Sequence, residues 1–332
     1  MKNSKCYVLL IVLLLSFDLG AQMPLFPNSV VSNEIDFISE ADPDSFTDLT
    51  FVGREDKEMP GAPDGSDLFD VNSFVFEAAF SDDETLEIWC HSSFSTEAAA
   101  REYADKLTPR LGKLPAFQRN MMDHVVIHNG DGGAFAEIEG QFFILYSENM
   151  DDRISTNDLE ETVFHESVHA SYQFMYEDSP EWTGAQSADS AFVTEYAQEN
   201  PRLEDIAESA LFAYTYLTQP GRLPADVETW LERNMANRLA FFGNIYSQVT
   251  SLNDVPGRRE LRVYPNPTSG VFNLYSGASL NGLLSVYNTN GELVKSKEYA
   301  NQEQIEISLI GLPVGLYVVS FPGYVNAKVF KF

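Results

Sequence analysis

The stretch LEETVFHESVHASYQFMY, from Leu159 to Tyr176, decides how the middle of this 332-residue chain is organised. Its apolar residues include the adjacent pair Val163 and Phe164, and then Val168 and Tyr172 at successive intervals of four positions. This spacing follows one face of an α-helix. Asn157, with Glu160 three residues later, is a candidate cap for its first turn. The segment is therefore predicted to be a helix.

This predicted helix carries the pattern His-Glu-x-x-His at residues 165–169. Four residues make about one helical turn, so His165 and His169 project from the same face and can reach one ion at about 2.0 to 2.1 Å, the usual distance between zinc and nitrogen. Glu166 is placed to take a proton from zinc-activated water and pass it to a leaving amine. The alternative is a helix that holds two histidines for packing, but only 5 histidines occur in the chain.

A catalytic zinc needs a third protein ligand, and a second predicted helix supplies candidates. Asn200 is expected to cap this helix, with Pro201 at its first position and an apolar stripe over residues 203–214. Glu204 and Glu208 would then lie one turn apart. One of them can bind zinc while the other accepts the remaining N–H of a ligand imidazole. The alternative for the pair is a solvated acidic face.

The His165–His169 motif, the later stretch FVTEYA at residues 192–197 and EDIAE at 204–208 together resemble the glutamate-zincin class of metallopeptidases. The likeness covers roughly residues 120–215 and is strongest to lethal-factor-like domains. It implies an α+β zincin-like fold, a mixed sheet with active-site helices, in which Glu204 is the third zinc ligand and Glu208 supports the site. Tyr196 would stabilise the oxyanion of the tetrahedral intermediate, with Tyr172 and Tyr214 as alternatives.

The resemblance also implies where substrate binds. Ala134–Glu139 and Phe142–Tyr146 read as a hairpin around Gly140 and Gln141, and one of its strands would pair with the main chain of an extended peptide. Which strand is exposed stays open. The segment Asp178–Asp189 is expected to be a loop at the specificity pocket, with Trp182, Gln186 and Asp189 unassigned. The reaction is hydrolysis of peptide bonds without a covalent intermediate.

The first residues indicate secretion. Lys2 and Lys5 precede an apolar run over residues 7–17, and small residues follow up to Ala21. This is the pattern of a signal peptide over residues 1–21. Its core of about 11 residues is shorter than a membrane span, and no later apolar run reaches about 18, so no membrane-spanning segment is expected.

Cys6 would leave with the signal peptide, so the mature chain would hold a single cysteine, Cys90. A disulfide framework is therefore not expected, and core burial with a metal would hold the domain together. A nucleophilic Cys90 activated by His91 is the less favoured reading, because adjacent residues of a strand point to opposite faces.

The charge excludes some partners. The chain carries 50 acidic against 21 basic residues, a net charge of -29, which would repel nucleic acid and anionic membranes. Solubility outside the cell explains this charge, and structural calcium sites are the alternative. Residues 22–70, acidic and rich in turn residues, are predicted to be irregular, with short strands or loose packing.

The remaining elements define the domains. Strands are expected at residues 74–80 and 86–89, a helix at 95–110 and another at 223–246, so the peptidase domain would cover residues 22–252. Residues 253–260, with Pro256 and Gly257, read as a linker. Seven short strands then suggest a small β-sandwich over residues 261–332, with Asn290-Gly291 as a hairpin turn.

This tail resembles the C-terminal sorting domain of the type IX secretion system, through VYPNP at residues 263–267, Asn290-Gly291 and LPVGLY at 312–317. The likeness implies contact with the secretion machinery, export across the outer membrane, removal of the tail and attachment to surface lipopolysaccharide. Composition alone would allow a sandwich that binds a glycan or a partner protein. Two functions are thus considered: a secreted zinc peptidase, and a surface-displayed binding protein with a degenerate, non-catalytic zinc site. The oligomeric state stays open.

Overall fold

The computed structural model describes residues 23–332 except 64, 138–139, 254–260, 289–292 and 322–326. The predicted signal peptide and Cys6, linker residues 254–260 and the Asn290-Gly291 turn lie outside the described residues. The chain divides into two compact units, residues 1–243 and 244–332, and each is described by itself. No helix of the described chain is long and apolar enough to cross a membrane.

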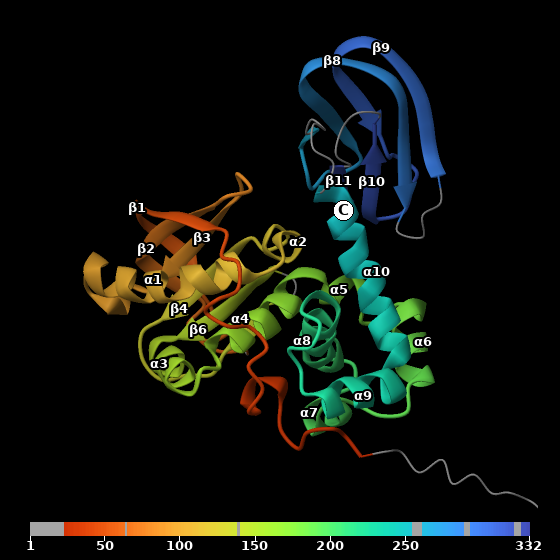
Figure 1. The fold of residues 1–332 in the computed structure, drawn as a ribbon. Helices are drawn as coiled ribbons and strands as arrows, with labels where there is room; N and C mark the ends of the chain where they lie inside the picture. Colours follow the sequence, from red (N-terminus) through yellow and green to blue (C-terminus); the bar gives the residue numbers. More distant parts are fainter. Residues whose placement is uncertain (1–22, 64, 138–139, 254–260, 289–292, 322–326) are drawn as a thin grey trace, which may run out of the picture. The chain divides into compact units, whose positions relative to one another are not determined.

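A six-stranded mixed sheet forms one layer of the first unit, in the order β1-β2-β3-β4-β6-β5 (Figure 1). The pairs β3–β4 and β4–β6 are parallel and the others antiparallel. The strands are β1 (Phe46–Glu58), β2 (Phe69–Phe80), β3 (Thr85–Cys90), β4 (His124–His128), β5 (Phe135–Glu137) and β6 (Phe142–Tyr146). Every residue of β4 is buried, as expected where both faces of a sheet are covered.

The first unit also contains helices and short helical turns. The prediction of helices together with a mixed sheet is therefore confirmed. The helical elements are η1 (Val30–Ser32), η2 (Ser92–Phe94), α1 (Glu97–Lys113), α2 (Ala116–Arg119), α3 (Ser147–Thr156), α4 (Leu159–Val168), η3 (His169–Gln173), α5 (Phe174–Tyr176), α6 (Pro180–Ala188), α7 (Glu195–Glu199), α8 (Asp205–Thr218) and α9 (Ala225–Asn234), followed by α10 (Ala236–Asn253). Helix α8 packs against α4, all ten residues of which are buried.

The prediction that residues 22–70 are irregular was wrong for much of that stretch. Strand β1 spans 13 residues within it, and β2 begins at Phe69. Strand β1 lies at the sheet edge and pairs only with β2 among the described strands. Leu49 is its one buried side chain, so charged residues occupy β1 without the apolar alternation that identifies a strand.

Three local predictions in the helical region were also wrong. Asn157 does not cap the motif helix, because it ends α3 in the left-handed conformation, at φ 62° and ψ 36°. The helix expected at residues 223–246 is two helices, α9 and α10, which break at Met235. The expected loop at 178–189 contains α6, with Ser179 as its cap and Pro180 at its first position, the arrangement that proline favours.

The second unit contains a five-stranded sheet. Its strands lie in the order β11-β10-β8-β7, and β9 pairs with β8. The strands are β7 (Arg262–Tyr264), β8 (Val271–Asn288), β9 (Leu293–Ser308), β10 (Gly315–Ser320) and β11 (Ala327–Lys331). Seven short strands were expected, but β8 and β9 each run through two of them. Irregular register around Leu280 and Gly282 absorbs the polar residues that read as turns.

Candidate metal centre

Three ligand atoms from two helical segments meet in the first unit. The Nε2 atoms of His165 and His169 lie 3.1 Å apart, and Glu204 Oε2 lies 3.4 Å and 3.3 Å from them, respectively. Four tetrahedral ligands at about 2.0 to 2.1 Å from zinc are separated by roughly 3.3 Å. The spacing of the three atoms therefore fits one zinc ion, and among the described residues they are the group of this kind that could hold a metal.

The motif helix changes its winding at the second histidine. Helix α4 contains His165, and the π-helical turn η3 begins at His169. Such turns occur mostly as single insertions in α-helices, often at functional sites. At the end of η3, the buried Gln173 donates its Nε2 proton to the Leu203 carbonyl at 2.8 Å. This bond ties the motif helix to the residue that precedes Glu204.

Glu204 occupies the N-cap position of α8 rather than a place within the helix. The predicted cap was wrong: Asn200 ends the short helix α7, which Thr194 caps by accepting the Ala197 N–H at 3.1 Å. Residues 201–204 form turns before α8. The Glu208 N–H still donates to the Glu204 carbonyl at 2.9 Å, so the two glutamates are one turn apart as expected.

A buried ionic network holds the start of α8. Arg238 is 1% exposed and donates to both carboxylate oxygens of Asp205, at 2.7 and 3.0 Å, and to Asp189 at 3.0 Å. Gln186 donates to Asp205 at 2.8 Å. Gln186 and Asp189, which were expected near a specificity pocket, therefore help to hold Asp205, the neighbour of Glu204. Trp182, from the same segment, is buried against aromatic rings of α10.

Glu208 lies behind the first histidine and is fully buried. Its Oε1 is 3.4 Å from His165 Nδ1, longer than a good hydrogen bond. Its carboxylate accepts hydrogen bonds from the Ser29 hydroxyl at 2.5 Å, the Val30 N–H at 2.8 Å and the Thr194 hydroxyl at 2.6 Å. Sequence reasoning missed these three donors, two of which come from the stretch predicted to be irregular.

The carboxylates around His165 make its surroundings electronegative, which favours positive charge at this position. Burial lowers the pKa of this imidazole, but its hydrogen bond with Glu204 and the charges of Glu166 and Glu208 outweigh burial and raise the pKa to about 9. The imidazoles act in the opposite direction on Glu204, whose pKa is lowered even though burial opposes that shift. Three carboxylates in a buried site therefore call for compensating positive charge, which a divalent ion would supply.

Glu166 is buried on the same helix, 8% exposed. Burial disfavours its carboxylate and raises its pKa, against the opposing influence of His165 and His169. A raised pKa brings a carboxylate nearer to neutral pH, where it can both accept and return a proton. The structure thus places Glu166 within electrostatic reach of the two histidines and Glu204.

Tyr196 on α7 is brought to the site at its rim, with 39% of its surface exposed. Partial burial and the charge and hydrogen bond of Glu204 raise its pKa, so the phenol stays protonated at neutral pH. The two alternatives are packed elsewhere: Tyr172 is buried against Phe117, and Tyr214 is half-buried against Phe164.

The hairpin predicted before the motif helix is present, and its first strand is the exposed one. Strand β5 lies at the end of the sheet and pairs antiparallel with β6, Ala136 opposite Phe143. It contacts η3, the turn that begins at His169. Among the described strands, β6 is its single partner, so β5 is the edge strand at this end of the sheet.

Cys90 is buried and forms no disulfide within the described part of the chain. Burial raises the pKa of its thiol, which disfavours the nucleophilic thiolate. His91, its neighbour, lies 3.1 Å from Asp70 instead. The structure therefore agrees with a packed cysteine rather than a catalytic one.

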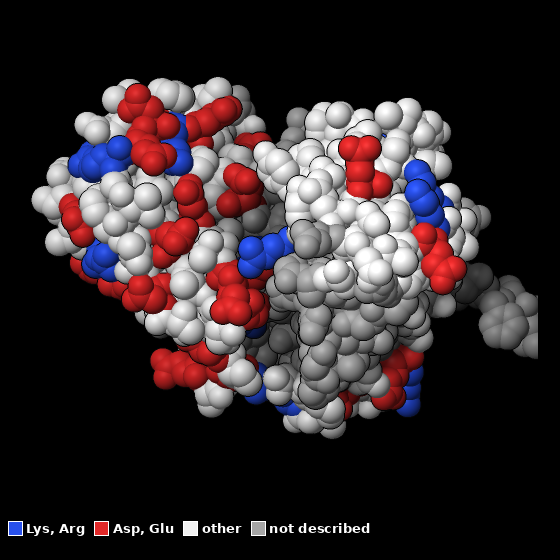
Figure 2. Space-filling model, turned by 90° about the horizontal axis from the view of Figure 1, so that it is seen from above, with Lys and Arg blue, Asp and Glu red and all other residues white. Residues whose placement is uncertain are grey.

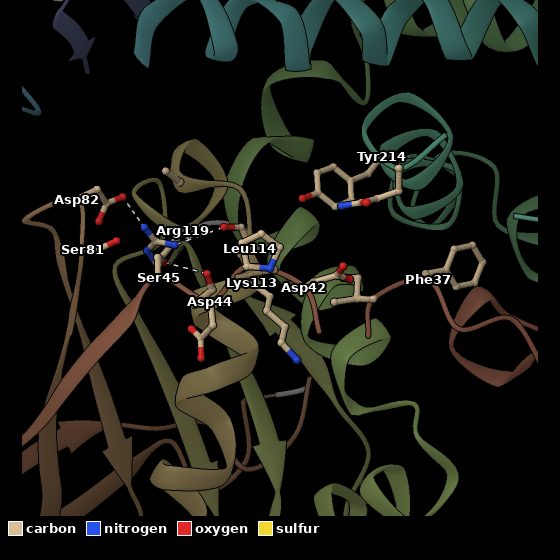
Figure 3. A pocket seen from close by; sticks show the side chains of 15 residues that line it. Phe37, Asp42, Asp44, Ser45, Ser81, Asp82, Lys113, Leu114, Arg119 and Tyr214 are labelled. Atoms are coloured by element: carbon tan, nitrogen blue, oxygen red, sulfur yellow. Dashed lines mark hydrogen bonds and ion pairs between the residues drawn. The ribbon is translucent and has the colours of Figure 1, made fainter. Parts of the chain in front are cut away.

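A hollow of about 430 Å³ lies elsewhere in the first unit, and no ligand atom of the metal centre lines it (Figure 3). Most of its charged side chains are already paired, Arg119 with Asp82, Asp42 with Arg222 and Lys113 with Glu160, and Asp44 accepts the Phe46 N–H. Figure 2 shows many acidic and few basic side chains on the face that it displays. Nevertheless, no cluster of carboxylates alone that could hold calcium occurs among the described residues.

Glu161, one turn before His165, gives a pH-dependent prediction. Its carboxyl is 1% exposed, Oε1 accepts the N–H groups of Phe37 and Ile38, and Oε2 has no hydrogen-bond partner among the described residues. Burial raises its pKa from 4.5 to about 7. A raised folded-state pKa adds stability that is complete below about pH 4.5 and is lost as pH rises through about 7.

Replacing this carboxyl by an amide should remove that loss. When the pH is raised from 5 to 8, the natural chain should lose up to about 3 kcal/mol more unfolding free energy than Glu161→Gln, the equivalent of the pKa shift. Urea unfolding at the two pH values measures it. Glu148→Gln, at an exposed position of α3, should show no such gain. An equal pH dependence in the Glu161 variant and the natural chain would contradict the prediction.

Comparison with known proteins identifies the C-terminal part. Residues 262–332 match the family model of the secretion system C-terminal sorting domain. The tail therefore interacts with the type IX secretion machinery, and the protein is exported across the outer membrane to the cell surface or the extracellular space. No curated protein matches the chain significantly.

Three solved structures show weak likeness. A DUF3244 protein with an immunoglobulin-like β-sandwich from Bacteroides vulgatus is 13% identical, over 22% of this chain and 92% of that one, with a TM-score of 0.17. The CBM51-2 and INT domains of Clostridium perfringens ZmpB are 20% identical, over 22% and 16% of the chains, with a TM-score of 0.14. Their complex with GlcNAc is 20% identical, over 26% and 21%, with a TM-score of 0.15. TM-scores this low support no conclusion.

Proposed function

We propose that the first unit is a zinc-dependent peptidase with a zincin-like fold, in which His165, His169 and Glu204 hold the ion. The observation that carries the proposal is the spacing of their three ligand atoms, 3.1 to 3.4 Å, which suits tetrahedral zinc. Zinc, when bound, would polarise the carbonyl of the peptide bond and make a water molecule more acidic. Export to the outside of the cell suits an enzyme that acts on external protein or peptide.

The residues of the chain would share the work of hydrolysis. Glu166 would accept a proton from the attacking water and deliver it to the leaving amine, a task suited to a buried carboxylate with a raised pKa. Tyr196, protonated at the rim of the site, would donate a hydrogen bond to the carbonyl oxygen as it gains negative charge. Glu208 would hold His165 in the tautomer that leaves Nε2 free for the metal.

The open edge of β5 would align the substrate. An extended peptide can add to a strand edge through main-chain hydrogen bonds, which depend little on side-chain identity. Because β5 contacts the turn that begins at His169, a peptide bound there would run past the metal centre. The substrate class is thus a polypeptide in extended conformation.

The second unit would act as a small β-sandwich that is removed after export, with the first unit attached to surface lipopolysaccharide. Its match to the sorting-domain family supports this course. Its buried core, from Phe272 to Val329, would let it fold as a unit that the secretion machinery can bind.

Cleavage of a peptide library by the purified mature chain tests the proposed activity. We expect cleavage of extended peptides by the zinc-loaded protein, its loss after treatment with a chelator, and its return when zinc is restored. If the zinc-loaded chain left a broad library intact, the alternative of a surface-displayed binding protein with a non-catalytic site would replace the enzyme.

A further inference from the structure

Two buried carboxylates, one on each active-site helix, hold the same N-terminal segment. We call residues 25–38 the N-terminal strap. Glu208 of α8 accepts hydrogen bonds from the Ser29 hydroxyl and the Val30 N–H, and Glu161 of α4 accepts hydrogen bonds from the N–H groups of Phe37 and Ile38 at 3.1 and 3.2 Å. These bonds join residues more than a hundred positions apart, so the strap lies across both helices.

Apolar and main-chain contacts fix the strap in place. The ring of Phe26 stacks on Phe212 of α8 at 5.7 Å between centroids, and Phe37 meets the same ring edge-on at 4.8 Å. The Phe26 N–H donates to the Val193 carbonyl at 3.0 Å, and its carbonyl accepts the Glu195 N–H at 2.9 Å. The strap therefore runs beside the segment that carries Thr194, the third donor to Glu208, and belongs to the folded core.

We propose that Ser29 of the strap is a positioning residue for the metal centre, acting through Glu208 on His165; this inference rests on the proposed zinc site. The Ser29 hydroxyl binds Oε1, the oxygen that faces His165 Nδ1 at 3.4 Å, while Val30 and Thr194 bind Oε2. With both oxygens held, the carboxylate cannot rotate away. It therefore stabilises the proton on Nδ1 and leaves the lone pair of Nε2 directed at the ion.

The Glu208 carboxylate has an exposed fraction of zero, so no bulk water can replace a lost donor easily. Removing the Ser29 hydroxyl leaves Oε1 with the His165 imidazole as its remaining polar neighbour among the described contacts. The hydroxyl also caps η1 by accepting the Val31 N–H at 3.4 Å, and Ser29→Ala removes this long bond as well. The expected result is a weaker and less oriented partner for His165, with the ring and main-chain contacts of Phe26 and Phe37 intact. The effect should therefore reach the metal site without unfolding the unit.

The test compares full mature chains that carry Ser29→Ala, Ser29→Thr or Ser32→Ala. Competition with a chromogenic chelator should show a lower zinc affinity in Ser29→Ala, by up to the roughly 10- to 100-fold that the loss of a direct partner of a ligand costs. Ser29→Thr, which keeps a hydroxyl, should restore most of it. Ser32→Ala is the matched control, because that hydroxyl contacts only Arg153, at 3.5 Å, in the described structure. Equal affinity in Ser29→Ala and the natural chain would overturn the proposal.

A second readout separates this proposal from the proposed function. Nitrogen NMR shifts of the metal-free protein, recorded at about pH 10 so that the His165 imidazole is neutral, should show His165 protonated on Nδ1 in the natural chain and a mixture of tautomers in Ser29→Ala. If the natural chain bound no zinc, the peptidase proposal would fall, whereas the tautomer comparison would still decide the role of Ser29. Glu208→Gln should weaken zinc binding as well, and adding Ser29→Ala to it should cost little more, because both changes remove one interaction. Additive losses would contradict the pathway through Glu208.

Discussion

Glu166→Gln should abolish peptide cleavage while zinc stays bound. The amide has nearly the size of the carboxylate but cannot accept a proton from water, and a positioned general base typically contributes about 10²- to 10⁴-fold to a rate. Glu166 is not one of the three residues that could hold the ion, so affinity for zinc should change little. Initial rates on a cleaved peptide, measured beside the zinc content of the same sample, give both quantities.

The matched control is Glu181→Gln, the same chemical change on the exposed surface of α6. It should leave both rate and zinc content unchanged. A Glu166 variant that kept its full rate would exclude this residue as the proton carrier. A variant that lost its zinc would show instead that Glu166 helps to hold the ion.

Glu204→Ala should have the second large effect, on zinc binding itself. Removing the carboxylate leaves two imidazoles, whose Nε2 atoms are 3.1 Å apart, to hold the ion without their third partner. The affinity should fall by more than the roughly 10- to 100-fold expected for a supporting residue. Chelator competition measures it, with Glu208→Gln as the comparison. A larger loss in Glu208→Gln than in Glu204→Ala would exchange the roles of the two glutamates.

The motif helix could be predicted because its information is local. The interval from His165 to His169 is one helical turn, and the interval from Glu204 to Glu208 remains one turn even though α8 begins later than expected. The predicted cap at Asn200 failed because Thr194, a competing cap, starts a separate short helix. Several nearby residues in a sequence can serve as N-caps, so capping residues alone do not define the residue at which a helix begins.

The support of the site could not be predicted, because it depends on contacts between distant residues. Ser29 lies in an acidic, turn-rich stretch, and nothing in its sequence neighbourhood indicates that it reaches Glu208. Arg238 lay inside a predicted helix, and its pairing with Asp205 and Asp189 appears only once that helix is folded against α8. Edge strand β1 was missed for a similar reason, since it gains its order from β2 rather than from its own pattern.

The central claim is that His165, His169 and Glu204 hold one zinc ion. Zinc binding by the natural chain, measured by chelator competition together with X-ray absorption at the zinc edge, tests this claim most directly. We predict one zinc per chain, with two imidazole nitrogens at about 2.0 to 2.1 Å and a carboxylate oxygen as protein ligands. A purified mature chain that binds no zinc, or that binds it without histidine, would contradict the account.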